Sequence, residues 1–285
     1  LLLINFENAA TTSGYAVKGD VPLKCDPSYV PLAKANNNTV AALANNHLFD
    51  YGTDGMKDTL KSLDDAGITH IGAGNNESQA RQTASSDING RNITIINYMD
   101  SNNFKEYSTD VMPQANGSNP GYSAYDSDVA KCQIQDAKAN GLDVVIVYFH
   151  FGNEYSRSPN PDQEKMAHEV IDYGADAVLG SHPHVTQGIE MYKGKPIFYS
   201  LGNFIFDMSN SATHIAYIVK MDFVNDTGEC TVYPVIISGY LPYFMGPDEG
   251  TSLLNSLSPQ CDDLEITPEG TGKLYFNLTG DTNEL

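Results

Sequence analysis

The residues of this sequence that are best suited to chemistry are histidines that follow short apolar runs. The sharpest local signal is Gly180-Ser181-His182-Pro183-His184, which places two imidazoles two residues apart. Pro183 fixes φ between them and can help the chain to turn both side chains inward. Since imidazole suits zinc, manganese, iron and nickel, this motif predicts metal binding. The alternative interpretation is a pair of polar loop histidines.

Two further motifs carry similar residue types. Asn45-Asn46-His47 can supply an amide oxygen to a metal and an acid to a leaving oxygen, or can form an ordinary turn and helix cap. His150 begins the segment His150-Phe151-Gly152-Asn153-Glu154-Tyr155. Within it, Glu154 can orient a metal ligand, act as an acid or base, or be a solvated loop carboxylate. These motifs add candidates for a metal site and for proton transfer.

The elements that must position these motifs are expected to be β-strands that alternate with helices. We expect strands over 39–44, 143–149, 175–179 and 197–201, and helices over 53–66, 126–140 and 162–173. Continuous apolar strands separated by helices indicate an α/β fold with βαβ units. Sites in open α/β sheets form at the carboxyl ends of strands. We therefore expect one edge to collect Glu7, Asn46, His150, His182, His184 and Asn203.

The remaining segments give further expectations. Residues 101–124 are rich in Asn, Ser, Pro and Gly and predict a long surface loop. Segments 189–192 and 196–199 predict a hairpin, and strands are expected at 92–98, 215–223, 230–237 and 274–278. The Gly19-Asp20 dipeptide resembles a metal-binding pair, but it lies in a turn-like stretch and is interpreted as a loop.

Composition limits the class of protein. The 285 residues are 41% hydrophobic, which excludes a disordered chain, and no apolar run reaches the roughly 18 residues of a membrane span. The net charge of −20 argues against a nucleic acid partner and favours attraction of cations. Four cysteines without a Cys-x-x-Cys pair exclude zinc-knuckle and thioredoxin motifs. They can form disulfides, Cys230 and Cys261 being the closest pair in sequence, or remain thiols.

Several segments together resemble the CapA family of capsule-synthesis proteins, which is linked to poly-γ-glutamate. The similar blocks are Asn-Phe-Glu at 5–7, Leu-Ala-Asn-Asn-His-Leu-Phe-Asp-Tyr-Gly at 43–52, His-Phe-Gly-Asn-Glu-Tyr at 150–155, the segment 174–188, and Lys-Pro-Ile-Phe-Tyr-Ser-Leu-Gly-Asn-Phe at 195–204. They occur in the family's order and spacing up to about residue 207. The likeness beyond Asp207 is thin.

This resemblance implies an α/β fold of the calcineurin-like metallophosphoesterase class, a sandwich of α/β/β/α layers with a metal site at one sheet edge. It implies a divalent metal cofactor, with two ions of manganese, zinc or iron. The implied metal ligands are Glu7, Asn46, His150, His182 and His184. The implied catalytic residues are His47 and Glu154. Asn45, Asp50, Gln187 and Asn203 are implied to contact substrate or to orient ligands.

Two departures from the family pattern stand out. The usual opening strand that ends in Gly-Asp is absent, so we expect this sequence to lack that strand and with it either one metal ligand or a whole metal ion. Phe151 replaces the usual Trp. We expect residues 1–245 to form the CapA-like domain and 246–285 a polar extension packed on it or trailing it. The resemblance also implies a location on the extracellular face of the cell membrane, with an N-terminal anchor outside this sequence.

Three functions are compatible with these observations. The first is a metal-dependent hydrolase, acting on a phosphoester or on the isopeptide polymer. The second is a non-enzymatic component of an exported capsule-synthesis complex, which binds an anionic polymer such as poly-γ-glutamate beside a membrane synthase. The third is a structural protein that has kept the fold and lost the site. The sequence leaves enzymatic activity itself open.

Overall fold

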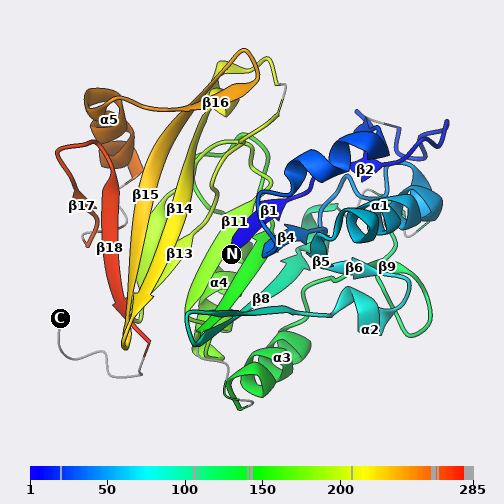
Figure 1. The fold of residues 1–285 in the computed structure, drawn as a ribbon, viewed down its shortest axis with the longest axis horizontal. Coiled ribbons are helices and arrows are strands. Elements are labelled where there is room, and N and C mark those ends of the chain that lie inside the picture. Colours follow the sequence, from blue (N-terminus) through cyan, green and yellow to red (C-terminus); the bar gives the residue numbers. More distant parts are fainter. Residues whose placement is uncertain are drawn as a thin grey trace. The chain divides into compact units, whose positions relative to one another are not determined.

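The structure is a computed structural model, and Figure 1 shows its fold. It describes residues 1–19, 21–104, 107–108, 110–139, 141, 144–206, 208–257, 261 and 263–278. The chain forms two compact units, Leu1–His150 and Phe151–Leu285. Gly19 lies in a loop as expected, whereas Asp20 lies outside the described residues. Asn140, Asp143 and the segment 279–285, on which parts of three expectations fall, also lie outside them.

The first unit is built from parallel strands and helices. Its elements are β1 (Leu2–Asn5), β2 (Ala9–Ala10), β3 (Lys24–Cys25), η1 (Pro27–Ala33), β4 (Thr39–Ala42), α1 (Gly52–Ala66), β5 (Thr69–Ile71), β6 (Ala73–Gly74), α2 (Glu77–Ala80), β7 (Ala84–Ile88), β8 (Arg91–Met99), η2 (Ser101–Phe104), β9 (Gly121–Tyr122), α3 (Ser127–Ala139) and β10 (Val144–His150). Strands β1, β4 and β5 form a parallel sheet in that order. Strand β10 pairs with β8 in parallel over its whole length, and β7 pairs with β8 in antiparallel orientation.

Helix α1 shows how the sequence sets these elements. Met56, Leu60 and Leu63 recur at helical spacing and are all buried. The helix ends at Gly67, whose φ of 64° is left-handed and whose N–H donates to the carbonyl of Leu63. The helix expected over 53–66 is therefore confirmed. Strands β5 and β6, which follow this helix, are separated at Gly72, whose φ is 91°.

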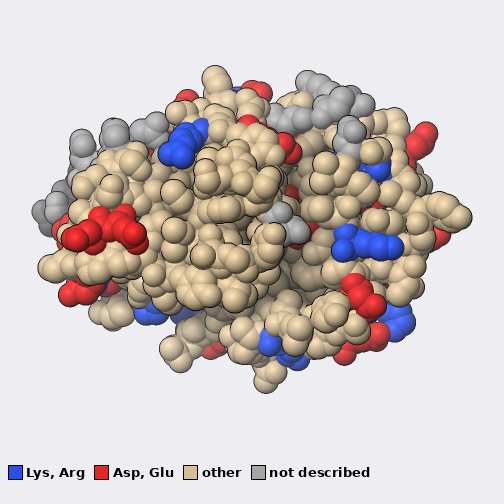
Figure 2. Space-filling model, turned by 90° about the horizontal axis from the view of Figure 1, so that it is seen from above, with Lys and Arg blue, Asp and Glu red and all other residues tan. Residues whose placement is uncertain are grey.

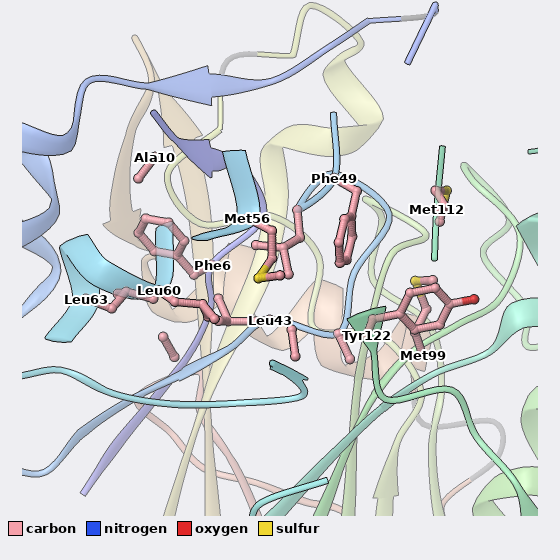
Figure 3. Close-up of a cluster of buried hydrophobic side chains, with 14 of the residues drawn as sticks. Phe6, Ala10, Leu43, Phe49, Met56, Leu60, Leu63, Met99, Met112 and Tyr122 are labelled. Atoms are coloured by element: carbon pink, nitrogen blue, oxygen red, sulfur yellow. The ribbon is translucent and has the colours of Figure 1, made fainter. Parts of the chain in front are cut away.

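The core of the first unit gathers buried apolar side chains from distant parts of its sequence, as Figure 3 shows. Phe6, Leu43 and Phe49 meet the inner face of α1 in this cluster. Met112 and Tyr122, from the segment expected to be a surface loop, belong to the same cluster. The expectation for residues 101–124 was therefore wrong in part. The segment is polar in composition, but its few apolar side chains are buried in the core.

The second unit combines a short mixed sheet with a long antiparallel one. Its elements are α4 (Pro161–Asp172), β11 (Ala177–Ser181), β12 (Ile189–Tyr192), β13 (Lys195–Phe198), η3 (Ser211–His214), β14 (Ile215–Val224), β15 (Thr227–Ser238), β16 (Leu241–Phe244), α5 (Pro247–Leu257), β17 (Glu265–Ile266) and β18 (Gly272–Asn277). Strand β13 pairs with β11 in parallel and forms the expected hairpin with β12. Figure 1 shows β14, β15 and β18 as long neighbouring strands, in agreement with their antiparallel pairing.

The expected α/β class is confirmed, since parallel strands alternate with helices as far as β11. The tail expected to be a polar extension supplies α5 and, close to the strand expected over 274–278, β18, which pairs with β15. On the face that Figure 2 shows, Lys and Arg side chains are scattered, and some of them lie beside Asp or Glu side chains. No helix among the described residues is both long and apolar enough to cross a membrane.

Candidate functional site

In the first unit, the turn after β4 is held in place by Asn45. Its Oδ1 accepts hydrogen bonds from the N–H groups of His47 at 3.1 Å and Leu48 at 3.0 Å. Its Nδ2 donates to the carbonyl of Phe6 at 3.0 Å. These bonds use the amide inside the protein, so Asn45 fixes the turn that carries Asn46 and His47.

The His47 imidazole is tied to a buried carboxylate. His47 Nδ1 lies 2.6 Å from Oδ2 of Asp50, which is 0% exposed. Because an ionised carboxylate can only accept, the Nδ1 of His47 must carry the proton that is donated to Asp50. The contact fixes the ring orientation and leaves Nε2 as the nitrogen that faces away from Asp50. Asp50 is thereby a residue that orients His47.

Asn46, His150 and Glu7 lie together in the same unit. His150 Nε2 lies 2.8 Å from Oδ1 of Asn46 and 3.8 Å from Oε1 of Glu7. His150 ends β10 and is fully buried, and the ring of Phe104 stacks on it at a centroid distance of 6.3 Å. Glu7 follows β1 and accepts from Nδ2 of Asn5 at 2.5 Å. The two strand ends and the turn thus bring an amide oxygen and a carboxylate to the imidazole of His150.

In the second unit, the loop after β11 brings His182 and His184 to one carboxylate. Donor atoms of these two histidines and of Glu154 all lie within 4.8 Å of one another. Both histidines are buried, and Glu154 is exposed. His182 and His184 have left-handed φ angles of 100° and 58°, which are strained for residues other than glycine. The chain on both sides of Pro183 turns sharply, and this turn gathers the imidazoles.

Asn203 orients one of these imidazoles. Its Oδ1 accepts a hydrogen bond from Nδ1 of His184 at 2.9 Å, so Nε2 is the ring nitrogen of His184 that would bind a metal. The rings of Tyr155 and Phe206 lie beside the same imidazole, with centroid distances of 6.4 Å and 5.0 Å. Asn203 therefore acts through His184.

Gln187 fixes the segment that carries Glu154. Its Nε2 donates to the carbonyls of Ser156 and Ser158, both at 3.0 Å, and its Oε1 accepts from Nε2 of Gln163 at 2.9 Å. Gln187 is 0% exposed. With both amide ends used inside the protein, Gln187 positions the loop before α4.

One residue of this region was missed from the sequence. Lys18 is only 4% exposed, and its Nζ lies 3.1 Å from the carbonyl oxygen of Asn46, 3.5 Å from Nδ1 of His47 and 3.7 Å from Oδ1 of Asp50. It stands in a segment with neither a strand-end position nor a motif, so nothing in the pattern singled it out.

The two clusters fit the donor preferences of divalent transition metals. Imidazole nitrogens and carboxylate or amide oxygens are ligands that manganese, zinc and iron accept. Each cluster has a supporting contact beyond its donors, Asn5 to Glu7 in the first unit and Asn203 to His184 in the second. Such contacts orient metal ligands in proteins. The residues therefore suit metal ions in both units.

The fold and these clusters define an α/β protein with buried histidine–carboxylate groups near strand ends. The chain belongs to the family described as bacterial capsule synthesis protein PGA_cap, whose model matches residues 1–208. The resemblance to capsule-synthesis proteins is thereby confirmed.

Two relatives illustrate the family. The PGA biosynthesis protein CapA of Bacillus subtilis (strain 168) is 36% identical over 285 aligned positions, gaps included, and the alignment covers 96% of this chain and 71% of that protein. The capsule biosynthesis protein CapA of Bacillus anthracis is 35% identical over 204 residues, 70% of this chain and 48% of that protein. The chain thus spans about half the length of the B. anthracis relative.

Solved structures are more distant. The calcineurin-like phosphoesterase YfkN of Bacillus subtilis gives a TM-score of 0.39 at 13% identity, over 89% of this chain and 71% of that chain. The sulfate thiohydrolase SoxB of Thermus thermophilus gives 0.44 at 12% identity, over 79% of this chain and 44% of that chain. Similarities of this size carry no conclusion about the present chain.

Proposed function

We propose that this protein is a metal-dependent hydrolase of capsule or poly-γ-glutamate biosynthesis, with phosphoesterase-like chemistry of the calcineurin-like kind. The observation that carries the proposal is the convergence of His182, His184 and Glu154, whose donor atoms lie within 4.8 Å of one another. Two left-handed histidines are costly to keep in a fold, and a site that needs both imidazoles is a physical reason for the strain.

Two ligand sets support two metal ions. Glu7, Asn46 and His150 would hold one ion in the first unit, and Glu154, His182 and His184 would hold another in the second. When bound, such ions polarise a phosphoryl oxygen and lower the pKa of water. Manganese, zinc and iron all suit these donors.

His47 is the proposed general acid. Asp50 accepts a hydrogen bond from Nδ1–H of His47. Nε2 is therefore the atom from which His47 would give a proton to a leaving oxygen. Asn45 keeps the backbone of this turn fixed through its bonds to His47 and Leu48. Glu154, which is exposed beside two imidazoles, serves as a ligand or as an acid or base.

The decisive experiment measures metal content per chain by elemental analysis, on full-length protein purified without chelator. The same sample is tested on a chromogenic phosphodiester with and without added manganese. The hydrolase proposal requires about two ions and turnover. The double variant His182→Ala/His184→Ala should lose metal from the second unit while circular dichroism shows a retained fold. Unchanged metal content in that variant would remove both histidines as ligands.

His47 is tested separately from metal binding. His47→Ala should keep its metal and lose turnover by about 100-fold or more, since general acid catalysis contributes 10²–10⁴-fold. An unaffected rate would remove His47 as the acid. The half-buried His70, which lies 3.2 Å from Oδ1 of Asp64, provides a matched control, and His70→Ala should change neither quantity.

A second function is a metal-dependent component that binds an anionic polymer without hydrolysing it, beside a membrane synthase. A relative in Mycobacterium tuberculosis, 32% identical over 75% of this chain, is described as "Probable polyglutamine synthesis accessory protein". Metal binding together with retention of poly-γ-glutamate and no turnover on phosphodiesters would favour this function. We also propose action on the extracellular face of the cell membrane, to be tested by protease treatment of intact cells.

A further inference from the structure

The described residues between β2 and β3, 11–19 and 21–23, reverse the usual pattern of burial. Tyr15, Val17 and Val21 are 88%, 48% and 75% exposed, whereas Lys18 in their midst is 4% exposed. Lysine is almost never fully buried without a partner, and apolar side chains normally take the inner positions. The inversion shows that this segment is folded around its lysine.

The ammonium group of Lys18 lies among polar groups of the first unit. Its Nζ donates to the carbonyl of Asn46 at 3.1 Å and lies 3.7 Å from Oδ1 of Asp50. The ring of Tyr107 adds a cation–π contact, with its centroid 5.2 Å from Nζ. The two carboxylate oxygens of Asp50 thus have different partners. Oδ1 faces the ammonium of Lys18, and Oδ2 lies 2.6 Å from Nδ1 of His47.

The backbone of the same segment is fastened to Asp50 as well. The N–H of Val17 donates to the Asp50 carbonyl at 2.8 Å, and the N–H of Leu23 donates to Asp50 Oδ2 at 2.6 Å. Residues on both sides of Lys18 are therefore held at one residue, Val17 by the backbone carbonyl of Asp50 and Leu23 by its carboxylate. A buried ion pair is a poor source of stability, because desolvation offsets much of its attraction, and its best-attested use is to fix an arrangement.

We infer that Lys18 is a positioning residue, which holds the Asp50 carboxylate in the orientation that keeps the Nδ1–H of His47 in its hydrogen bond. The backbone N–H groups of Val17 and Leu23, which lie on either side of Lys18 in the sequence, hold the chain at Asp50 and so keep this ammonium in place. Lys18 itself does not touch substrate and acts through Asp50. The arrangement of the three side chains is independent of metal, whereas its effect on turnover rests on the proposed hydrolase function.

The first test is spectroscopic and needs no substrate. In ¹⁵N-labelled protein in chelator, the His47 Nδ1–H gives a downfield imidazole signal, assigned by its loss in His47→Gln. Lys18→Met should shift this signal or broaden it through exchange with water. Lys57→Met is the matched control, because Lys57 is exposed and pairs with Asp54 at 4.0 Å in the same unit. It should leave the signal unchanged.

Two results would overturn the inference. One is an unshifted signal in Lys18→Met, and the other is the absence of the signal from the wild-type protein. If Lys18→Met fails to fold by circular dichroism, Lys18→Gln takes its place. The amide of Lys18→Gln carries no charge but can still donate a hydrogen bond, and the same shift is expected.

The second test uses turnover and a double-mutant cycle. If the wild type hydrolyses a phosphodiester, Lys18→Met should lower kcat by about 10- to 100-fold with KM unchanged, as expected for a misplaced catalytic group. Lys18→Met/Asp50→Asn should be no slower than Asp50→Asn alone, since both act on one contact. If the losses in kcat of the two single variants add up in the double variant, Lys18 does not act through Asp50. A wild type without turnover would reject the hydrolase proposal and leave the spectroscopic test in force.

Discussion

Gln187 gives a sharp test of how the second unit positions Glu154. The substitution Gln187→Leu keeps a side chain of similar size in a site that is 0% exposed. It removes two donated hydrogen bonds, to the carbonyls of Ser156 and Ser158, and the acceptor of the bond from Gln163. The backbone bonds of residue 187 remain possible.

The expected loss of stability follows from these contacts. The three bonds contribute about 1 kcal/mol each, and the amide of Gln163, itself 1% exposed, is left buried without its acceptor at a cost of about 1–3 kcal/mol. Ser156 and Ser158 lie near solvent, so water can replace the bonds to their carbonyls, and the added leucine buries apolar surface. The net loss in the free energy of unfolding is therefore about 2–4 kcal/mol, or about 5–10 °C in Tm.

Urea titration followed by circular dichroism measures this loss, and elemental analysis measures metal retention. We expect metal affinity to fall by about 10- to 100-fold, because the loop that carries Glu154 is released. Gln133→Leu is the control, since Gln133 accepts from the hydroxyl of Tyr98 and donates to the carbonyl of Arg81, both at 2.7 Å, in the first unit. It should lower stability without changing metal affinity. A loss below about 1 kcal/mol in Gln187→Leu would refute the reasoning.

Further predictions concern strain and thiol reactivity. Gly72→Ala should lower the free energy of unfolding by about 3 kcal/mol or more, because φ is 91° and the new Cβ would lie 2.0 Å from Oδ1 of Asn97. Gly90→Ala, with φ of 83° and open space around it, should lose only about 1 kcal/mol in the same denaturation assay. In native protein at pH 8, iodoacetamide should modify Cys132, which is exposed, well before Cys230. Burial raises the pKa of the Cys230 thiol and so lowers its thiolate fraction, and peptide mass spectrometry of the two sites would show equal rates if this is wrong.

Much of the fold could be predicted because local pattern and tertiary packing agree. The spacing of Met56, Leu60 and Leu63 with Gly67 fixed the limits of α1 to within one residue. The apolar run before His150 became β10, which is buried throughout. The expected strand over 175–179 instead forms at Ala177–Ser181, so His182 follows it directly. Strand ends shift in this way because pairing with a neighbour, here β13, decides them.

The candidate site was less predictable than the strands that carry it. Imidazoles at strand ends could be found from sequence, and the structure groups His182 with His184 and His150 with Asn46. Gln187 was expected to contact substrate or to orient a ligand, and the structure uses its whole amide to hold a loop. These contacts depend on partners 24 to 31 residues away, which no local pattern contains.

The burial of Lys18 could not be predicted from the sequence. A lysine among Tyr15, Val17 and Val21 has the pattern of a surface loop with scattered apolar residues, and only the fold reveals that the lysine lies inside and the apolar residues outside. The left-handed histidines at 182 and 184 are equally invisible in sequence. Both features oppose the local preference of the chain, and both lie among the candidate site residues. Local preference is overruled where surrounding contacts determine a strained or buried polar arrangement, and sites that need defined geometry are where such arrangements are kept.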